Sequence, residues 1–461
     1  MYKQSLAAAI ALASISTGAF AADPAPAGFI DGSKATLSSR TMYFRNDARA
    51  NPLPTATNPN PRGVDQEESG QGFLFNFLSG YTVGTVGFGL DVQGMTGIHL
   101  DGGRGHHPDN NSFFPSDSDG SSEHTWSRLG ANGKVKFAKT ELKVGTALQP
   151  NLPILVSNDG RLLPQTFQGG IISSKDLDNF TFTAGKITQA AGRATSNYSG
   201  LSVNGATQDS NSFQFAGVDW KATKDLTLQA YHSQLEDFYK QTFLGAVHVL
   251  PLGADSSFKT DVRYFDSSSD GKNGDTGYSF NNNGGYAKNR GEVDNKTWSA
   301  MFTYALGGHS FLVGHQQVGD DGGMVWLNNG SITGNGAANG RNEGQGGASF
   351  YLFTDSMINQ FARAGENTTF GQYSYDFGRI GVPGLKAAIA YLHGDDIKDV
   401  NGGSDHSEWE RDMRLDYVIQ SGVFKNLGAT LRHGVYRGDD SGSTRNTDQT
   451  RLIFNYTYAF K

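Results

Sequence analysis

Cysteine is absent from the 461-residue sequence, and positive charge is in the minority. The lack of cysteine excludes a disulfide-linked scaffold, a zinc site with thiolate ligands and a cysteine nucleophile. Lysine and arginine number 38 against 45 aspartate and glutamate residues, for a net charge of -7, which argues against nucleic acid as the main partner. Long apolar runs are also missing, because no segment beyond the N-terminus reaches the roughly 18 apolar residues of a membrane-spanning helix.

Glycine and aromatic residues, in contrast, are abundant, with 61 Gly, 30 Phe and 18 Tyr. A disordered chain is poor in aromatic residues, so this composition indicates a folded protein. The length suits two or three ordinary domains, or one large barrel.

The first 21 residues have the features of a secretory signal. Lys3 supplies a positive charge, residues 6–15 are largely apolar, and Ala19-Phe20-Ala21 is a small-x-small cleavage site. We therefore expect residues 1–21 to be a signal peptide that is cut after Ala21. Residues 22–461 then form the exported protein, which can span a membrane only as strands.

Apolar and polar residues alternate in segments of about ten residues throughout the exported part. In residues 451–460, Leu452, Phe454 and Tyr456 share one face, and Arg451 shares the other face with further polar residues. Such a period of two predicts a strand with one apolar and one polar face. The same alternation occurs in residues 86–92, 297–304, 385–391 and 413–420.

The connections between these segments differ greatly in length. Tight turns are expected at residues 79–80, 139–140 and 307–308, and long loops rich in Gly, Asn, Asp and Ser at residues 101–122, 267–289, 328–347 and 395–407. Short turns at one rim and long loops at the other are typical of a transmembrane β-barrel. About 440 residues, at roughly 24 per strand and connection, predict about 18 antiparallel strands around an aqueous channel.

Both ends of the exported chain agree with this all-β architecture. Strand patterning begins by Ala35, which leaves no room for a plug domain and disfavours a 22-stranded energised transporter. Tyr456, Tyr458 and Phe460 are expected in an aromatic girdle at the periplasmic interface. Lys461 follows them, whereas such barrels commonly end on an aromatic residue.

If the apolar faces contact lipid, the opposite faces line the lumen. The basic residues on the lumen face of the segments that can be phased are Arg40, Lys134, Lys136, Lys143, Lys259, Arg263, Lys386, Arg414, Arg432 and Arg451. The acidic residues there are Asp91, Glu141, Asp261 and Asp416. A basic interior inside a low-dielectric wall attracts anions, and a guanidinium group pairs with a carboxylate at two points. A solvated wall, whose charges have no special role, is the alternative for any single residue.

A loop must narrow so wide a lumen, and residues 150–169 are the best candidate. This segment holds three prolines, an apolar run at residues 152–156 and Arg161. An ordinary loop outside the cell would hardly carry that apolar run. We therefore expect the loop to fold into the lumen and to place Arg161 at the constriction.

The sequence resembles the OprD family of substrate-specific outer-membrane porins, found in Pseudomonas and its relatives, over essentially the whole exported chain. The most specific segments are NLPILVSNDGRLLPQTFQG (151–169), LEDFYKQTFLG (235–245), GHSFLVGHQQVG (308–319), GVPGL (381–385) and SEWERDMRLDYVIQSG (407–422). The resemblance implies an 18-stranded monomeric channel of the bacterial outer membrane, with third and seventh extracellular loops folded inward. It also implies a ladder of basic residues that guides small carboxylate-bearing solutes.

The positions that match the ladder of the family are Arg40, Arg414, Arg432 and Arg451, which the alternation of faces identifies independently. Asp355, in the segment YLFTDSMINQF, resembles the acidic side of the constriction of the family. The long loops at residues 101–122 and 328–347 match no pattern that can be carried over, and we expect them to hold the choice among solutes.

Other chemistry has little support. His106 and His107 with Asp109 are a weak metal motif, and the acidic clusters at residues 117–119 and 395–396 are read as solvated loop charge, with Ca²⁺ binding as the alternative. No serine lies in the Gly-x-Ser-x-Gly motif of a hydrolase. We expect no catalytic residue, no metal and no cofactor.

The leading hypothesis is therefore a passive channel for small anionic or zwitterionic solutes, such as aromatic acids, amino acids or small peptides. Weak sites suffice, because a tightly held solute would not leave. A weakly selective general porin is the alternative within transport, and a barrel enzyme or an adhesin is the alternative from another class. The expected partners are outer-membrane lipid, lipopolysaccharide and the barrel assembly machinery. The expected state is a monomer, with a loose trimer as the alternative.

Overall fold

The structure is a computed structural model that describes residues 28–48, 65–102, 106–108, 112–117, 121–282, 284–329, 347–439 and 446–460. The predicted signal peptide, Asp109, residues 118–119 of the first acidic cluster, most of the loop at 328–347, and Lys461 lie outside the described residues. Within the described part, no helix has the length and apolar character needed to cross a membrane.

Eighteen long strands and four two-residue strands make up the described secondary structure, together with one short 3-10 helix. The strands of the first half are β1 (Lys34–Ala48), β2 (Gln66–Leu78), β3 (Val86–Asp101), β4 (Thr125–Phe137), β5 (Thr140–Leu148), β6 (Asn151–Leu152), β7 (Leu155–Val156), β8 (Thr166–Ser174), β9 (Phe180–Ala191), β10 (Leu201–Ser202) and β11 (Phe213–Lys221). Those of the second half are β12 (Leu226–Leu235), β13 (Tyr239–Pro251), β14 (Ser256–Ser269), β15 (Asp294–Leu306), β16 (His309–Val318), β17 (Asn328–Asn329), β18 (Asn367–Asp376), β19 (Leu385–Ile397), β20 (His406–Val418), β21 (Gly428–Gly438) and β22 (Thr447–Phe460), with the helix η1 (Phe377–Ile380) before β19.

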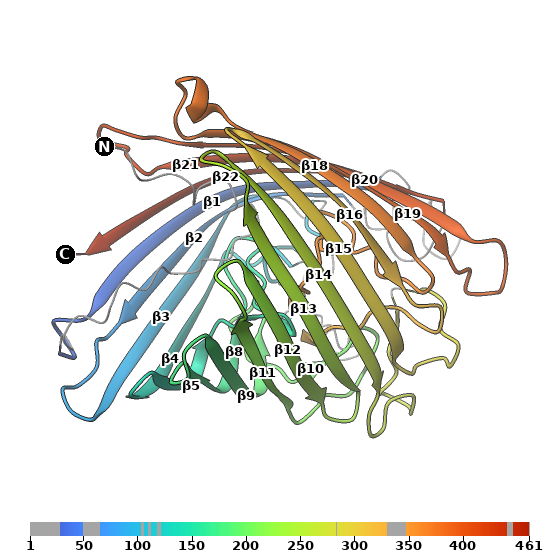
Figure 1. Cartoon of the computed structure of the whole chain (residues 1–461), viewed down its shortest axis with the longest axis horizontal. Coiled ribbons are helices and arrows are strands. Elements are labelled where there is room, and N and C mark those ends of the chain that lie inside the picture. Colours follow the sequence, from blue (N-terminus) through green and yellow to red (C-terminus); the bar gives the residue numbers. More distant parts are fainter. Residues whose placement is uncertain are drawn as a thin grey trace.

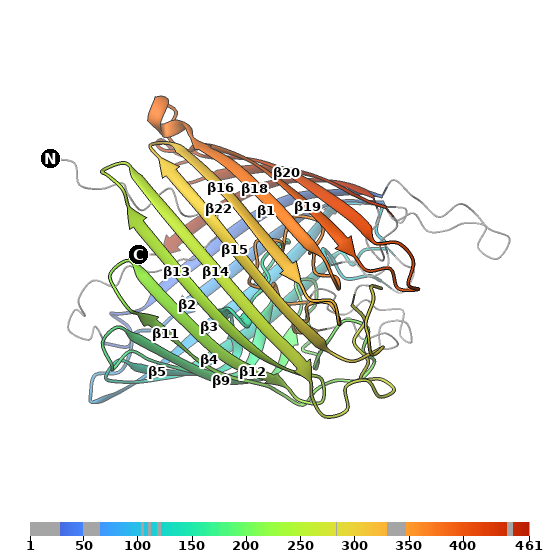
Figure 2. The same ribbon diagram turned by 45° about the vertical axis from the view of Figure 1, so that its right-hand side comes forward.

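The long strands form one closed antiparallel barrel. Each pairs with its neighbour in the sequence, and β1 pairs with β22, so that Ala35 lies opposite Phe460 and Arg40 opposite Asn455. Figures 1 and 2 show the strands tilted around a wide interior. The prediction of about 18 antiparallel strands is confirmed.

The outer wall carries the apolar face that the sequence predicted. Large apolar side chains at alternate positions are exposed, such as Leu415 at 44 %, Phe454 at 42 % and Tyr458 at 51 %. In a soluble protein such a surface would be unfavourable. In a bilayer it contacts hydrocarbon, and its aromatic side chains lie at the level of the lipid headgroups.

The connections separate into two rims, as predicted. Short turns such as residues 138–139 and 307–308 and the η1 turn join strands at one rim (Figure 1), and long connections such as residues 102–124 and 270–293 join them at the other. The connection at residues 236–238 is short even though it lies at the long-loop rim.

Three of the long connections fold together inside the barrel. We call them L3 (residues 149–165), L4 (residues 192–212) and L7, of which the structure describes residues 319–329 and 347–366. L3 contains the small β6–β7 hairpin, and its Val156 forms an antiparallel bridge with Ser349 of L7. L4 and L7 pair through β10 and β17. The predicted inward folding of the third and seventh loops is confirmed, and L4 joins them.

These loops give the lumen an apolar layer that the alternation of faces did not predict. Phe44 on β1 packs with Leu162 and Leu163 of L3. A Cβ atom on Gly72 of β2 would lie 3.1 Å from Leu162 Cγ, so this glycine leaves room for the loop. A second cluster joins inward aromatic residues of β11 to β14 with L3, L4 and L7. An inward loop must bury its apolar residues, so parts of the lumen wall are apolar where a loop covers them.

Candidate functional site: the constriction of the lumen

Two wall arginines hold the inward loops by their backbone. Arg40 Nη1 on β1 donates to Arg161 O of L3 at 2.7 Å. Arg451 Nη2 on β22 donates to Met357 O of L7 at 2.7 Å, and Arg451 Nη1 donates to Gly160 O of L3 at 3.3 Å. These bonds tie L3 and L7, which come from different parts of the barrel, to the adjacent wall strands β1 and β22.

Three of the arginines that the sequence singled out are paired with carboxylates at two points. Arg40 binds Asp159 of L3 with Nη1 and Nη2, at 2.8 and 3.0 Å. Arg414 binds Asp416, at 2.6 and 2.9 Å, two residues along the same strand. These carboxylates take up the charge-assisted donors of the guanidinium groups, so the two groups offer less to a passing anion.

Arg263 is the third paired arginine. It binds Asp261 at 2.8 and 2.9 Å, donates to Tyr351 O of L7 at 2.8 Å, and lies 3.8 Å over the Tyr351 ring. Lys259 also contacts Asp261, at 3.0 Å. Asp261 therefore pairs with two basic groups. Arg263 also binds the backbone of L7 and so attaches this loop to β14.

Three other arginines keep guanidinium donors that no described residue binds, and we call Arg161, Arg193 and Arg432 the arginine cluster. Arg161 donates only to the neighbouring Gly160 O and lies 4.7 Å over the Phe44 ring. The Nε atoms of Arg161 and Arg193 are buried without a hydrogen-bond partner in the described residues. Arg432 makes no hydrogen bond or ion pair to any residue that the structure describes. The sequence did not single out Arg193, which lies in L4 and follows no strand alternation.

The pKa values of Arg161 in L3 and Arg193 in L4 show that burial disfavours their charged forms. Burial, with the neighbouring guanidinium groups of Arg451, Arg193 and Arg432, holds the pKa of Arg161 well below its ordinary value. Burial lowers the pKa of Arg193 to about 10, against the opposing effect of Asp355 and Asp159. Buried like charges with free donors gain most from an anion that enters between them.

Asp355 of L7 lies close to this cluster, as the electrostatic influence of Arg193 on its carboxyl group indicates. Burial raises the pKa of Asp355 to about 6, although the Ser349 hydroxyl, Arg193 and Arg451 favour its charged form. Asp355 also lines a hollow of about 360 Å³ between L7 and β14, together with Lys259 and Tyr351.

A row of acidic side chains on β20 was missed by the sequence analysis. Glu408, Glu410 and Asp412 share the inward face, and we call them the acidic row; Glu408 and Glu410 are at most 1 % exposed. The alternation of Met413 to Asp416 continues backwards into this segment, so the signal was present but was not followed. The set of four lumen-facing acids from the phased segments was therefore incomplete, since Glu408, Glu410 and Asp412 also face inward.

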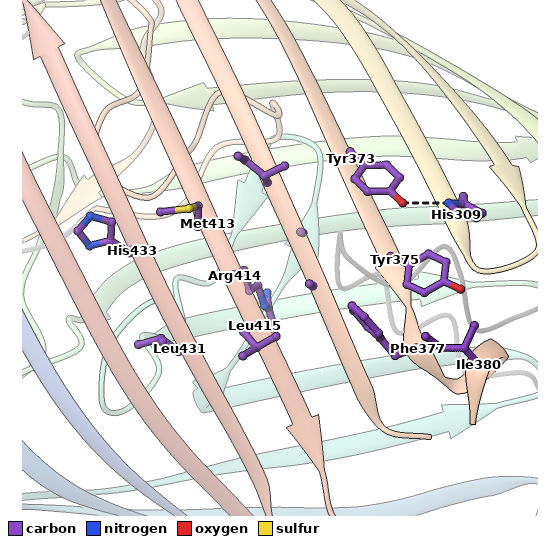
Figure 3. A pocket seen from close by; sticks show the side chains of 13 residues that line it. His309, Tyr373, Tyr375, Phe377, Ile380, Met413, Arg414, Leu415, Leu431 and His433 are labelled. Carbon is purple, nitrogen blue, oxygen red and sulfur yellow. Dashed lines mark hydrogen bonds between the residues drawn. The ribbon is translucent and has the colours of Figure 1, made fainter. Parts of the chain in front are cut away.

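A large hollow lies away from the lumen, on the outer wall. It has a volume of about 790 Å³ and is lined by Tyr373, Tyr375, Leu415 and Leu431, with His309 donating to or accepting from the Tyr373 hydroxyl at 2.9 Å (Figure 3). Leu415 and Leu431 belong to the exposed apolar face. This hollow therefore faces lipid and is not part of the solute path.

His107, in the connection between β3 and β4, is hydrogen-bonded within the protein. His107 Nδ1 lies 2.6 Å from Glu68 Oε1 of β2, and its Nε2 lies 2.9 Å from Ser116 Oγ. In the described ranges, no three His, Cys, Asp or Glu side chains are grouped so that they could hold a metal ion.

Comparisons with known proteins agree with this geometry. Residues 27–460 match the family described as outer membrane porin, OprD family. The porin-like protein GalP of Pseudomonas putida is 34% identical over 93% of this chain and 92% of its own length, and Porin D of Pseudomonas aeruginosa is 30% identical over 95% and 94%.

Solved structures give the same result. The crystal structure of Pseudomonas aeruginosa OccK8 (OprE) is 42% identical, with a TM-score of 0.81, and covers 94% of this chain and 100% of its own. That of Pseudomonas aeruginosa OpdK with vanillate is 31% identical, with a TM-score of 0.77 and the same coverage. The chain therefore belongs to the OprD family of porins and is a non-enzymatic, substrate-specific channel of the bacterial outer membrane.

Proposed function

We propose that the channel admits small solutes that carry a carboxylate, and that the arginine cluster is the main point of selection. The observation that carries this proposal is that the buried Nε donors of Arg161 in L3 and Arg193 in L4 have no partner among the described residues. Arg193 and Arg432 lie close enough to Arg161 to act on it electrostatically. OpdK, which is similar over its whole length, has been crystallised with vanillate, a carboxylate.

The path that we propose uses the wall arginines unequally. A carboxylate about 4 Å from one guanidinium group gains about 1 kcal/mol in water and up to about 4 kcal/mol at an effective dielectric near 20. The arginine cluster supplies this attraction, whereas Arg40, Arg263 and Arg414 are largely neutralised by their carboxylates. Arg451 holds the loops and adds positive charge. Asp355 supplies an acceptor for a hydroxyl or ammonium group on the same solute.

The test is uptake of matched solutes into proteoliposomes. An aromatic acid and its neutral amide are compared in the unmodified channel, in Arg161→Ala and in Arg161→Lys. We expect the acid to enter faster than the amide, and Arg161→Ala to slow the acid about tenfold, since each ~1.4 kcal/mol is tenfold in binding. Arg161→Lys keeps the charge but loses the two-point guanidinium geometry. Its uptake of the acid should lie between that of the unmodified channel and that of Arg161→Ala.

Arg437→Ala is the matched control, because Arg437 is paired with Asp448 at 2.7 Å on the rim side of β21. Equal uptake of the acid and the amide would instead indicate a weakly selective general porin. An equal effect of Arg161→Ala and Arg437→Ala would remove Arg161 from the site.

The remaining expectations stay proposals. Residues 1–21 are proposed as a signal peptide, removed before the barrel is inserted by the assembly machinery. Lipopolysaccharide is proposed as the neighbour of the long-loop rim, and the channel is proposed to act as a monomer. Mass spectrometry of the purified protein tests the first, through an N-terminus at Ala22.

A further inference from the structure

The acidic row binds L7 by accepting hydrogen bonds from backbone and side-chain groups of the loop. Glu410 accepts the N–H groups of Ile358 and Asn359, both at 2.8 Å, and Asp412 accepts the N–H of Met357 at 3.2 Å. Three successive amides of L7 are thus bound by two carboxylates of one strand. Met357 is also the residue whose carbonyl binds Arg451, so this grip fixes the segment of L7 that faces the constriction.

Glu408 extends the grip toward the long-loop rim. It accepts hydrogen bonds from Asn359 Nδ2 and the Tyr436 hydroxyl and forms an ion pair with Arg363. Arg363 N in turn donates to Glu366 Oε2 at 3.0 Å, at the end of L7. Residues 357–359 and Arg363 of L7 are therefore held against β20 by acidic side chains.

These carboxylates are more numerous than the charges that face them. Arg363 of L7, Tyr436 and Arg432 of β21, and Arg451 of β22 face the group, and on β19 the facing residue is Gly394. Two oxygens have no hydrogen-bond partner among the described residues although both are buried. They are Glu366 Oε1 and Asp412 Oδ1.

Two pairs of these carboxyl groups each share a buried site. Burial, with the like charge of Glu408, raises the pKa of Glu366 well above its ordinary value. Asp412 lies beside Glu410, which accepts two backbone N–H groups. Two carboxylates that share a buried site cannot both ionise cheaply, so each pair, Glu366 with Glu408 and Asp412 with Glu410, holds one proton between its two carboxyl groups.

We propose that Glu366 and Asp412, with Glu408 and Glu410, form a proton-dependent clamp that sets the position of L7 and hence the width of the constriction. The clamped state binds protons that the same carboxyl groups lose when L7 moves away and water reaches them. Rising pH therefore favours release of L7, and acidic pH tightens the clamp. The ratio of clamped to released channels changes by up to about tenfold per pH unit for each proton involved. The proposal does not depend on which solute the channel selects.

The experiment is single-channel conductance in planar bilayers between pH 5 and pH 8. We expect conductance, or the frequency of a larger conducting state, to rise with pH in the unmodified channel. Glu366→Gln and Asp412→Asn mimic the protonated groups, so each should keep the low-conductance state to a higher pH, and the double variant should flatten the response. Asp416→Asn, on the same face of the same strand but paired with Arg414 and not with L7, should keep the pH response.

A tether separates movement of L7 from a simple change of lumen charge. Val156 and Ser349 face each other across the bridge between L3 and L7, at the spacing of cross-strand partners that a disulfide can span. The chain has no cysteine of its own. Val156→Cys with Ser349→Cys, once oxidised, should abolish the pH response, and reduction should restore it.

Two results would overturn the proposal. A pH response that survives the oxidised tether would mean that lumen charge alone changes the current. An unmodified channel without any pH response, or amide variants that respond like the unmodified channel, would mean that the acidic row is a fixed anchor. The heat-dependent gel mobility of each variant checks that its barrel is folded.

Discussion

The acidic row on β20 and the arginine cluster lie close together, yet the protein uses their charges in opposite ways. Glu408 and Glu410 accept hydrogen bonds from L7, and Glu408 also accepts one from the Tyr436 hydroxyl. Arg161 and Arg193 keep buried Nε donors that no described residue fills. A buried polar group is normally satisfied, and an unsatisfied one needs a reason. The difference supports the proposal that Glu408 and Glu410 hold L7 in place and that the arginines are available to a solute.

The largest effect is expected where a satisfied group is removed. Glu408→Ala leaves Arg363 buried without its partner, and breaking a buried ion pair costs about 3–5 kcal/mol. Chemical unfolding of the purified barrel in lipid vesicles measures this loss. The matched control is Asp255→Ala, which breaks the exposed pair with Arg379 and should cost less than about 1 kcal/mol. Equal losses would mean that the acidic row does not stabilise the fold.

A smaller and different effect is expected where an unsatisfied group is removed. Arg193→Ala should leave the free energy of unfolding nearly unchanged, because among the described residues the guanidinium group makes a single hydrogen bond, to Asn158 at 3.0 Å. Uptake of an aromatic acid should fall about tenfold, which corresponds to ~1.4 kcal/mol. Uptake of the amide should not change. A large loss of stability with unchanged uptake would place Arg193 with the structural groups.

The comparison can also be sharpened by freeing a paired arginine. Asp159→Asn removes the charge that neutralises Arg40 while keeping a polar side chain in L3. Uptake of the acid should then rise by roughly fivefold, since about 1 kcal/mol of attraction becomes available. Arg414→Ala, which removes an arginine already paired with Asp416, should change uptake less than Arg193→Ala. An Asp159→Asn channel with unchanged uptake would show that pairing does not limit Arg40.

The smallest effect concerns Asp355, whose pKa of about 6 lies within reach of physiological pH. Because burial raises this pKa, the carboxyl group is charged above about pH 6 and neutral below it. The constriction gains net positive charge as pH falls, so the reversal potential in a salt gradient should shift toward anion selectivity through pH 6. Asp355→Asn should show the acidic selectivity at every pH. A shift that persists in this variant would belong to other groups.

Local alternation predicted most of the barrel, because lipid on one side and water on the other impose a period of two on each strand. The strand number, the two rims and the inward faces of Arg40, Arg263, Arg414, Arg432 and Arg451 follow from it. The apolar run in residues 152–156 placed L3 inside. The inward face of the acidic row follows from the same alternation, which runs along β20 from Glu408 to Asp416.

Only the tertiary structure decided which charges are used by the protein. Arg40 and Asp159 are 119 residues apart in the sequence, and the L7 amides that bind Glu410 are about 50 residues away from it. Arg193 lies in a loop, where no periodicity marks a direction. Strand faces depend on neighbours two residues away, so the sequence determines them by itself. Ion pairs inside a lumen depend on where long loops fold, and that position is determined only when L3, L4 and L7 pack against one another.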